Sequence, residues 1–306
     1  MYDLIGDTHG HATELAQLLT KLGYKKNSEG IYQHPTRKVI FLGDFIDRGA
    51  EVREVLQIAK SMCDAGTALS VMGNHEYNII TYHTKNKQGE YLRPHTPKNQ
   101  QGIAATLEAF EDYPEEWQMY LEWMKALPMW LDLGDLRVIH ACWHTDHLAK
   151  VQAAVGGNQL TPAFLQASAI KGSWEYESTE ILLKGIELPL PNGQVFHDKD
   201  GHERSNMRIR WWLSPQGQTL ESYGIGFTFP STPSPKEWAS NYYYGPTDPP
   251  VFIGHYWLKD QYPSLQSPSV CCLDYSVAKG GQLVAYRWNK GEVLSHAHFV
   301  GVPALV

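Results

Sequence analysis

One short pattern recurs along this chain: an apolar run that ends in glycine and is followed at once by a polar residue. The run occurs at residues 4–7, 41–44, 71–74 and 252–255, and a related run at 138–140 lacks the glycine. Such runs predict buried strands, and the glycine permits a sharp turn and close approach of another backbone. Because ligands bind parallel sheets at the carboxyl ends of their strands, we expect the polar residues to meet at one rim. They are Asp7, Asp44, Asn74, His140 and His255.

Helical periodicity separates the first three runs and indicates the fold class. Residues 11–22 and 50–62 repeat apolar side chains at helical spacing, between strands expected at 2–5, 38–42 and 68–72. This alternation of strand and helix predicts an α/β fold with a parallel sheet and right-handed crossovers.

The later part of the chain has clear patterns at both ends of a less regular middle. We expect a polar loop at 83–101, helices at 103–111 and 115–126, a hairpin of strands 129–133 and 136–140, and strands at 251–253, 270–273, 283–288 and 293–299. Residues 145–250 have weak periodicity, apart from a strand-like stretch at 207–212, and are too many for one loop. We interpret them as a cap-like insertion in a single domain that spans residues 1–306.

Composition excludes several classes of function. A formal net charge of −7 argues against a basic groove for nucleic acid, although metal ions can still attract phosphate to a negative protein. The four cysteines form no C-x-x-C pair, so we expect free thiols and no thiolate zinc site. No apolar run approaches the roughly 18 residues that cross a membrane, and no signal peptide is evident, so we expect a cytoplasmic protein.

The strand-end residues, together with His9, form a set of oxygen and nitrogen ligands that contains no sulfur. Such a set suits manganese, iron, zinc or similar divalent ions. Six ligands are too many for one tetrahedral zinc ion, but they suit two ions, roughly 3.5–4 Å apart, that share a carboxylate. We expect Asp44 to be the shared ligand because its strand is central in the strand order. The predicted ligands are Asp7, His9, Asp44, Asn74, His140 and His255.

The order of three motifs resembles that of the calcineurin-like metallophosphoesterases. The motifs are G-D-T-H-G at 6–10, G-D-F-I-D-R-G at 43–49 and G-N-H-E at 73–76. The D-R-G and N-H-E pieces point to the PPP-type serine/threonine phosphatase branch. The segments at 208–211, 252–255 and 273–288 are similar to bacterial PPP-type phosphatases and symmetrical diadenosine tetraphosphatases. The resemblance implies a metallophosphoesterase β-sandwich flanked by helices, with two divalent ions, manganese favoured.

The resemblance also assigns roles to individual residues. It gives Asp7, His9 and Asp44 to one metal, and Asp44, Asn74, His140 and His255 to the other. His75 matches the proton donor to the leaving group, and Asp47 matches the acid that orients it, as an imidazolium held by a carboxylate can do near neutral pH.

Substrate binding is assigned to Arg48, Asn74, Tyr275 and a second arginine. A planar guanidinium such as that of Arg48 can bind two phosphate oxygens at once. Either Arg208 or Arg210 is the second clamp, and the two share a face if they lie on a strand. The chain departs from the family pattern at Trp143 and in the Tyr-Ser-Val-Ala-Lys stretch after Asp274.

We therefore expect a PPP-like phosphomonoesterase in which metal-bound hydroxide attacks phosphorus and His75 is the general acid. Its substrate would be a phosphorylated small molecule, nucleotide or protein. The alternatives are a symmetrical dinucleoside polyphosphate hydrolase, a phosphodiesterase or nuclease, and a non-catalytic metal-binding scaffold. The sequence leaves the substrate, the metals and the oligomeric state open. We expect His144 and His147 to be a surface pair and Glu76 to be a charge at a helix N-terminus.

Overall fold

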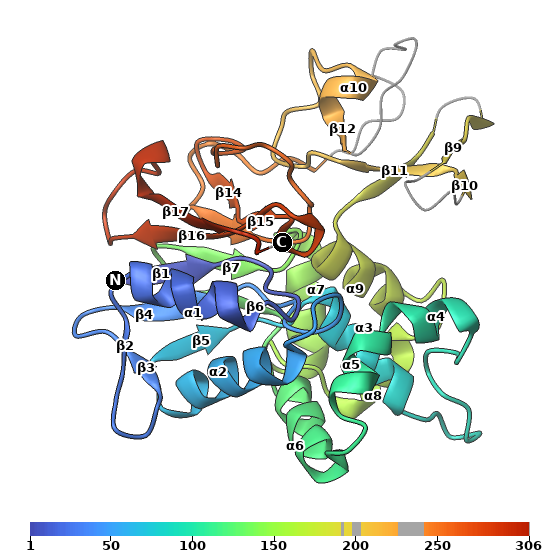
Figure 1. Cartoon of the computed structure of the whole chain (residues 1–306). Coiled ribbons are helices and arrows are strands. Elements are labelled where there is room, and N and C mark those ends of the chain that lie inside the picture. Colours follow the sequence, from blue (N-terminus) through green and yellow to red (C-terminus); the bar gives the residue numbers. More distant parts are fainter. Residues whose placement is uncertain (191–192, 198–202, 226–241, 306) are drawn as a thin grey trace.

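Three parallel strands form the first part of the largest sheet in the computed structural model, which describes residues 1–190, 193–197, 203–225 and 242–305 (Figure 1). β4 (Lys38–Phe41) lies between β1 (Tyr2–Ile5) and β5 (Ala68–Ser70) and pairs in parallel with both. Helices α1 (Ala12–Lys21) and α2 (Val52–Asp64) connect these strands. The predicted α/β class and the first three strands are thus confirmed.

Strands from the end of the chain complete this sheet. β16 (Gln282–Trp288) pairs antiparallel with β1, and β15 (Asp274–Tyr275) and β17 (Phe299–Pro303) both pair with β16. The prediction of a strand at 293–299 is wrong, because η4 (His296–His298) is a short helical turn and β17 begins only after it. The Ser295 side chain caps this turn by accepting the N–H of Ala297.

The second sheet has four strands and is also partly parallel. β13 (Val251–Ile253) pairs in parallel with β7 (Arg137–Ile139) and β14 (Val270–Cys272), and β6 (Trp130–Asp132) forms the predicted hairpin with β7. The strands that carry the polar motif residues are therefore divided between two sheets and not gathered in one.

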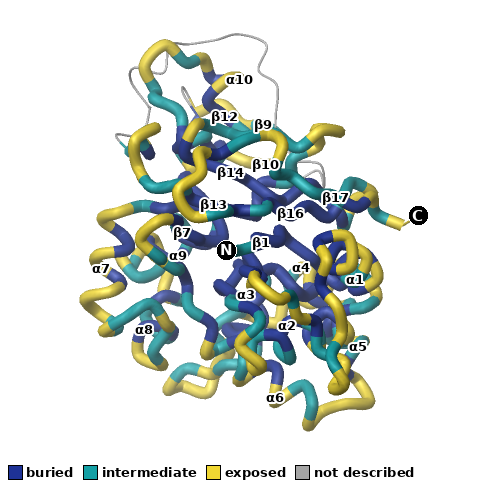
Figure 2. The backbone as a smooth tube through the Cα atoms, turned by 90° about the vertical axis from the view of Figure 1, so that its left-hand side faces the viewer, coloured by how far each residue is buried: buried dark blue, intermediate teal, exposed yellow. Residues whose placement is uncertain are grey.

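Side chains that alternate along the strands divide the core into two clusters. Leu4 and Ile40 pack against Val138 and Phe252 of the other sheet. Their neighbours on β1 and β4, among them Ile5, belong to the cluster that contains the helices α1 and α2. This period of two is what a strand buried on both faces requires. Figure 2 shows the strands buried and the exposed residues on the outer helices and loops.

Most of the middle of the chain is helical. α3 (Asn74–His83) follows β5 directly, and α5 (Ala104–Ala109) and α6 (Pro114–Lys125) match prediction. The predicted loop at 83–101 is wrong at its end, where α4 (Pro97–Gly102) forms. Thr96 starts this helix by accepting the N–H of Asn99, and proline suits the first helical position. No helix in the described ranges is long and apolar enough to cross a membrane.

The segment 145–250 consists of helices followed by small sheets, and residues 191–192, 198–202 and 226–241 of it lie outside the described part. Its elements are α7 (Thr145–Val155), α8 (Pro162–Ser168), α9 (Trp174–Lys184), β8 (Glu187–Pro189), β9 (Phe196–His197), β10 (Glu203–Arg204), β11 (Asn206–Ile209), α10 (Leu220–Tyr223) and β12 (Gly224–Ile225). In Figure 1 the helices lie around α3, whereas β11, β12 and α10 lie above α9. The expected strand at 207–212 stops at Ile209, and Trp211 and Trp212 are buried in the main core.

Candidate metal centre

Backbone hydrogen bonds join the strand ends at which the polar motif residues lie. The N–H groups of Thr8 and His9 donate to the carbonyl oxygen of Asp44, at 3.1 and 2.9 Å. In the other sheet, the N–H of Gly254 donates to the carbonyl oxygen of His140, at 2.8 Å. These bonds align adjacent strand ends within each sheet, so the predicted rim is real but spans the ends of two sheets.

Two motif glycines are needed because carboxylates occupy the space of a side chain. A Cβ at Gly73 would lie 2.2 Å from Oδ1 of Asp44, and one at Gly254 would lie 2.0 Å from Oδ1 of Asp7. Real Cβ atoms essentially never approach so closely. Neither glycine has a positive φ, so the requirement is steric and comes from the carboxylates.

Unusual backbone conformations concentrate at this place. A positive φ is uncommon outside glycine and costs energy that the surrounding structure must offset, so such residues often mark functional sites. In the described chain, the non-glycine residues with positive φ are His9, Asp44, Asp47, Arg48, His255, Trp257 and Ser276. Five of the seven are site residues predicted from the sequence.

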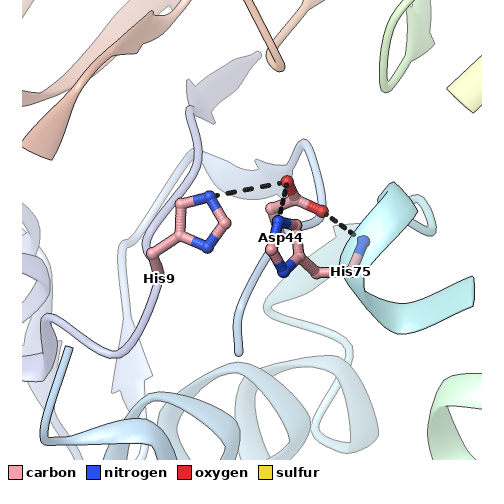
Figure 3. A group of neighbouring side chains, drawn as sticks. All are labelled: His9, Asp44 and His75. Atoms are coloured by element: carbon pink, nitrogen blue, oxygen red, sulfur yellow. Dashed lines mark hydrogen bonds and ion pairs between the residues drawn. The ribbon is translucent and has the colours of Figure 1, made fainter. Parts of the chain in front are cut away.

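Asp44 lies between two groups of side chains that could each hold a cation. One group is His9, Asp44 and His75 (Figure 3), and the other is Asp44, His140 and His255. Oδ2 of Asp44 lies 3.5 Å from Nε2 of His9 and 3.3 Å from Nε2 of His140. A carboxylate shared in this way matches the bridging position expected for Asp44.

Three histidines in these groups are oriented as metal ligands usually are. Nδ1–H donates to the carbonyl oxygen of Ile46 in His9 (2.8 Å) and to that of Leu42 in His140 (2.7 Å). In His255 it donates to Oδ1 of Asn74 (2.7 Å), which also lies 3.1 Å from Nε2 of His140. A hydrogen bond at Nδ1 fixes the tautomer and leaves Nε2 free for a metal.

Buried polar atoms without hydrogen bonds also fit a metal. Nε2 of His9, Nε2 of His255 and Oδ1 of Asp7 are fully enclosed and accept or donate no hydrogen bond. Such atoms are costly unless something satisfies them, and two divalent cations, one in each group, would do so. The other oxygen of Asp7 accepts the N–H of His255, at 2.9 Å, which places Asp7 beside the second group.

Proton affinities at this centre are strongly shifted in both directions. Burial and the carboxylates of Asp274 and Asp44 raise the pKa of Asp7 well above its usual range. Burial raises the pKa of Asp44, but the nearby His140 and His75 outweigh it and hold that pKa well below its usual range. Burial lowers the pKa of His140, but the carboxylate of Asp44 has the larger effect and raises that pKa to about 10. Bound cations can replace protons in such a crowded site.

A carboxylate binds His75 through the ring nitrogen that faces away from Asp44. Its Nδ1 lies 2.5 Å from Oδ2 of Asp47, and Asp47 in turn accepts the hydroxyl of Thr106 and donates its N–H to that hydroxyl oxygen. Burial lowers the pKa of His75, but Asp44 and Asp47 together raise it by more than burial lowers it. The net shift of the pKa is therefore upward. The arrangement stabilises an imidazolium that points towards Asp44, as a proton donor requires.

Glu76 links the motif at 43–49 to the motif at 73–76 through hydrogen bonds. Its carboxylate accepts the N–H groups of Asp44 (2.8 Å), Phe45 (2.9 Å) and Gly73 (2.9 Å). The last of these satisfies the N-cap N–H at the start of α3. The predicted role of Glu76 at a helix N-terminus is confirmed.

The three candidate arginines have different surroundings. Arg48 is exposed, with its guanidinium 5.5 Å from the ring of Trp257. Arg208 pairs with Glu187 at 3.1 Å. The pKa of His255 is lowered first by burial and next by the charge of Arg208, which therefore lies near that histidine. Arg210 instead donates to backbone carbonyls at the end of α10, such as that of Ser222 (2.8 Å). The structure therefore brings Arg208, and not Arg210, towards the centre.

Other predicted positions are used for packing. The hydroxyl of Tyr275 accepts the N–H of Ser264 at 2.7 Å, and its ring belongs to the core between the sheets. Tyr275 also lines a pocket together with Leu258 and Gln282, but it is in neither ligand group. Trp143 is buried in the main core. The prediction that His144 and His147 form a surface pair is wrong, because His147 is buried and bonds Ser178 at 2.8 Å.

Sequence reasoning missed Trp257 and the acid that holds it. The Trp257 ring stacks on His9 with centroids 5.6 Å apart. The backbone N–H of Trp257 donates to Oδ2 of Asp274, at 2.7 Å. Thr106, which binds Asp47, was also missed. The position of Trp257, two residues after His255, was the only available signal.

Residues 2–150 match the family model described as calcineurin-like phosphoesterase. This part of the chain is therefore similar to the calcineurin-like phosphoesterases, as the three glycine-led motifs indicated. The match includes the predicted residues from Asp7 to His140, whereas His255 and Arg208 lie beyond it.

Curated relatives are similar over part of their length. The asymmetrical bis(5′-nucleosyl)-tetraphosphatase PrpE of Oceanobacillus iheyensis is 30% identical over 145 residues, which are 45% of this chain and 54% of that protein. The chain thus spans about half the length of this curated relative.

Solved structures with low sequence identity share the fold over almost the whole chain. The cold-active protein-tyrosine phosphatase of a psychrophilic Shewanella species is 16% identical and gives a TM-score of 0.51, covering 99% of this chain and 80% of that one. A protein serine/threonine phosphatase from Saccharomyces cerevisiae is 15% identical with a TM-score of 0.50, covering 100% and 79%. The predicted metallophosphoesterase fold class is confirmed.

Proposed function

We propose that this chain is a metal-dependent phosphoric ester hydrolase with a two-cation centre. The observation that carries the proposal is the position of Asp44, which is shared by two ligand groups and lies 4.0 Å, through Oδ2, from Nε2 of His75. One carboxylate thus links two candidate cation positions to a candidate proton donor.

The ligand assignment follows the shared carboxylate. Asp7, His9 and Asp44 would hold one ion, and Asp44, Asn74, His140 and His255 would hold the other. When bound, such a pair of ions supplies Lewis acidity to phosphate oxygens and lowers the pKa of water. The family and the ligand set are compatible with several divalent ions, and manganese is the one we expect.

The protein's own residues would complete the reaction. Arg48 and Arg208 would bind phosphate oxygens that face away from the metals, because both are always charged and offer paired N–H donors. His75 would pass the proton on Nε2 to the departing oxygen, and Asp47 would stabilise the charged imidazole before transfer. Transfer of that proton is most important when the leaving group is a poor one, as in alkyl phosphomonoesters, which is why we place phosphomonoesters first.

A second candidate is hydrolysis of dinucleoside polyphosphates, which the names of the curated relatives favour. Those relatives are called asymmetrical, whereas the tail of the sequence resembles the symmetrical enzymes. Product analysis separates the modes, because diadenosine tetraphosphate gives two ADP when cleaved symmetrically and AMP with ATP when cleaved asymmetrically.

The test is a substrate panel with each candidate metal. Purified protein, stripped of metal and supplied in turn with manganese, iron, zinc and magnesium, is assayed with p-nitrophenyl phosphate, a phosphopeptide and diadenosine tetraphosphate. We expect metal-dependent turnover of at least one substrate. Turnover of none with any metal would contradict the proposal and favour a metal-binding scaffold.

A further inference from the structure

The buried hydroxyl of Thr106 makes its hydrogen bonds to one residue, Asp47. Thr106 lies in the short helix α5 and has no exposed surface. Its oxygen accepts the backbone N–H of Asp47 at 3.0 Å, and its proton is donated to Oδ1 of the Asp47 carboxylate. The two residues are 59 positions apart in the chain, so tertiary folding brings them together.

The direction of this hydroxyl is unusual for a threonine in a helix. Such a hydroxyl commonly bonds a carbonyl group of the preceding turn. In this chain Thr20, Thr81 and Thr179 all do so, because each donates to the carbonyl oxygen four residues earlier. Thr106 instead donates outside its own helix to a buried carboxylate. Helix geometry therefore does not account for this contact, whereas the site does.

The residue that Thr106 binds lies in a strained loop. Asp44, Asp47 and Arg48 have φ angles of 52°, 67° and 71°. Such conformations persist outside glycine only where the surrounding structure enforces them. The loop connects a candidate metal ligand to a candidate phosphate-binding arginine. The bond from the N–H of Asp47 to Thr106 thus fixes the backbone between these two groups.

The pattern of donors fixes which nitrogen of His75 can release a proton. The Thr106 hydroxyl faces an N–H, which cannot accept its proton, and Oδ1 of Asp47, which can. The other oxygen of Asp47 lies 2.5 Å from Nδ1 of His75. Because an ionised carboxylate only accepts hydrogen bonds, Nδ1 bears a proton. Nε2, which lies 4.0 Å from Oδ2 of Asp44, is therefore the nitrogen that gives a proton up.

We propose that Thr106 is a positioning residue for the general acid. Its hydroxyl holds the Asp47 carboxylate in the orientation that keeps a proton on Nδ1 of His75 and directs Nε2 towards the leaving group. Thr106 acts through Asp47 and not by contact with the substrate. This inference rests on the proposed hydrolase function and extends the pair of Asp47 and His75 to a chain of three side chains.

Rates with two leaving groups test the proposal. Thr106→Val removes the hydroxyl and leaves a side chain of nearly the same shape. It should lower kcat for phenyl phosphate, which has a poor leaving group, about 10–100-fold, the usual effect of a hydrogen bond to a charged group. The loss for p-nitrophenyl phosphate should be much smaller, because its leaving group departs with less need of a proton. Thr106→Ser keeps the hydroxyl and should retain both rates.

Two controls separate positioning from folding. Thr179→Val removes a hydroxyl that is also buried, on α9, and should change neither rate. Metal content and the midpoint of urea unfolding are measured beside each rate, and Thr106→Ala makes the same test if the valine variant does not fold. Equal losses for the two esters, or no loss for phenyl phosphate, would overturn the inference.

Nuclear magnetic resonance of the histidine rings gives a readout that needs no turnover. In isotope-labelled, zinc-loaded protein, His75 should show a strongly hydrogen-bonded proton on Nδ1, identified by its loss in His75→Asn. The signal should persist in Thr106→Ser and shift or disappear in Thr106→Val. An unchanged signal in Thr106→Val, or no such signal in the wild type, would overturn the inference. If the wild type hydrolyses neither ester but the signal depends on Thr106, the proposed function fails while the positioning contact stands.

Discussion

Substitution of Gly254 by alanine should disable metal binding through a clash with a single carboxylate. The new Cβ would lie 2.0 Å from Oδ1 of Asp7, 3.0 Å from its Cγ and 3.4 Å from Oδ2. Asp7 is only 2% exposed, and its Oδ2 is fixed by the N–H of His255, so the carboxylate has little room to retreat. The oxygen without a hydrogen bond, which we assign to a metal, is the one that the methyl group displaces.

The size of the effect follows from this crowding. Overpacking of a buried site costs about 1–3 kcal/mol, and a disturbed ligand shell commonly weakens metal binding by about 10–100-fold. The assay is calorimetric titration of manganese into metal-free protein, with a urea unfolding curve recorded in parallel. We expect the manganese affinity of at least one of the two sites to fall in Gly254→Ala by close to 100-fold.

Gly157→Ala is the matched control. Gly157 also lacks a positive φ, and a Cβ there would meet no atom within 4 Å, so neither metal affinity nor stability should fall. If Gly254→Ala binds manganese as tightly as the wild type and Gly157→Ala do, Asp7 is not a metal ligand and the reasoning is refuted.

Three further changes separate the roles of individual side chains. His75→Asn should retain both metals but lower kcat by about 10²–10⁴, and full activity on substrates with poor leaving groups would contradict the proton-donor role. Arg208→Ala should lower kcat/KM at least about tenfold, whereas Arg210→Ala should act on thermal stability instead; equal kinetic losses would contradict this assignment. Burial lowers the pKa of His144 to about 4. The unfolded chain, with an ordinary pKa of 6.5, therefore takes up that proton first, and stability falls as the pH drops from about 6.5 towards 4. The check is the midpoint of urea unfolding at pH 7.5 and at pH 5. His144→Phe should reduce the difference between the two midpoints, and an unchanged difference would exclude His144 as a cause.

Local signals in the sequence were sufficient for the strand ends and their polar residues. Asp7, Asp44 and Asn74 each follow an apolar run and one glycine, so this local pattern predicted their positions without knowledge of the rest of the fold. The helices between them were equally local. The short helix α4 was also signalled locally, by Thr96 before Pro97, but the polarity of the surrounding stretch concealed it.

Contacts distant in the sequence were not predictable. The pairing of β16 with β1 joins the two ends of the chain, so the division of strands between two sheets does not follow from periodicity. Arg208 and Arg210 look equivalent in the sequence, and only the position of α10 directs Arg210 away. Trp257 and Asp274 are seventeen residues apart and meet through folding, which explains why the sequence did not predict their contact.

A centre of two cations on one carboxylate requires that metal content and turnover change together. Metal-free protein receives increasing manganese, and bound metal per chain is determined by mass spectrometry beside the rate of phosphate release. We expect turnover to rise as occupancy approaches two ions per chain, and Asp44→Asn to lose both metal binding and turnover. Full turnover by the metal-free protein, or two bound ions and full turnover in Asp44→Asn, would contradict the two-cation centre built on this shared carboxylate.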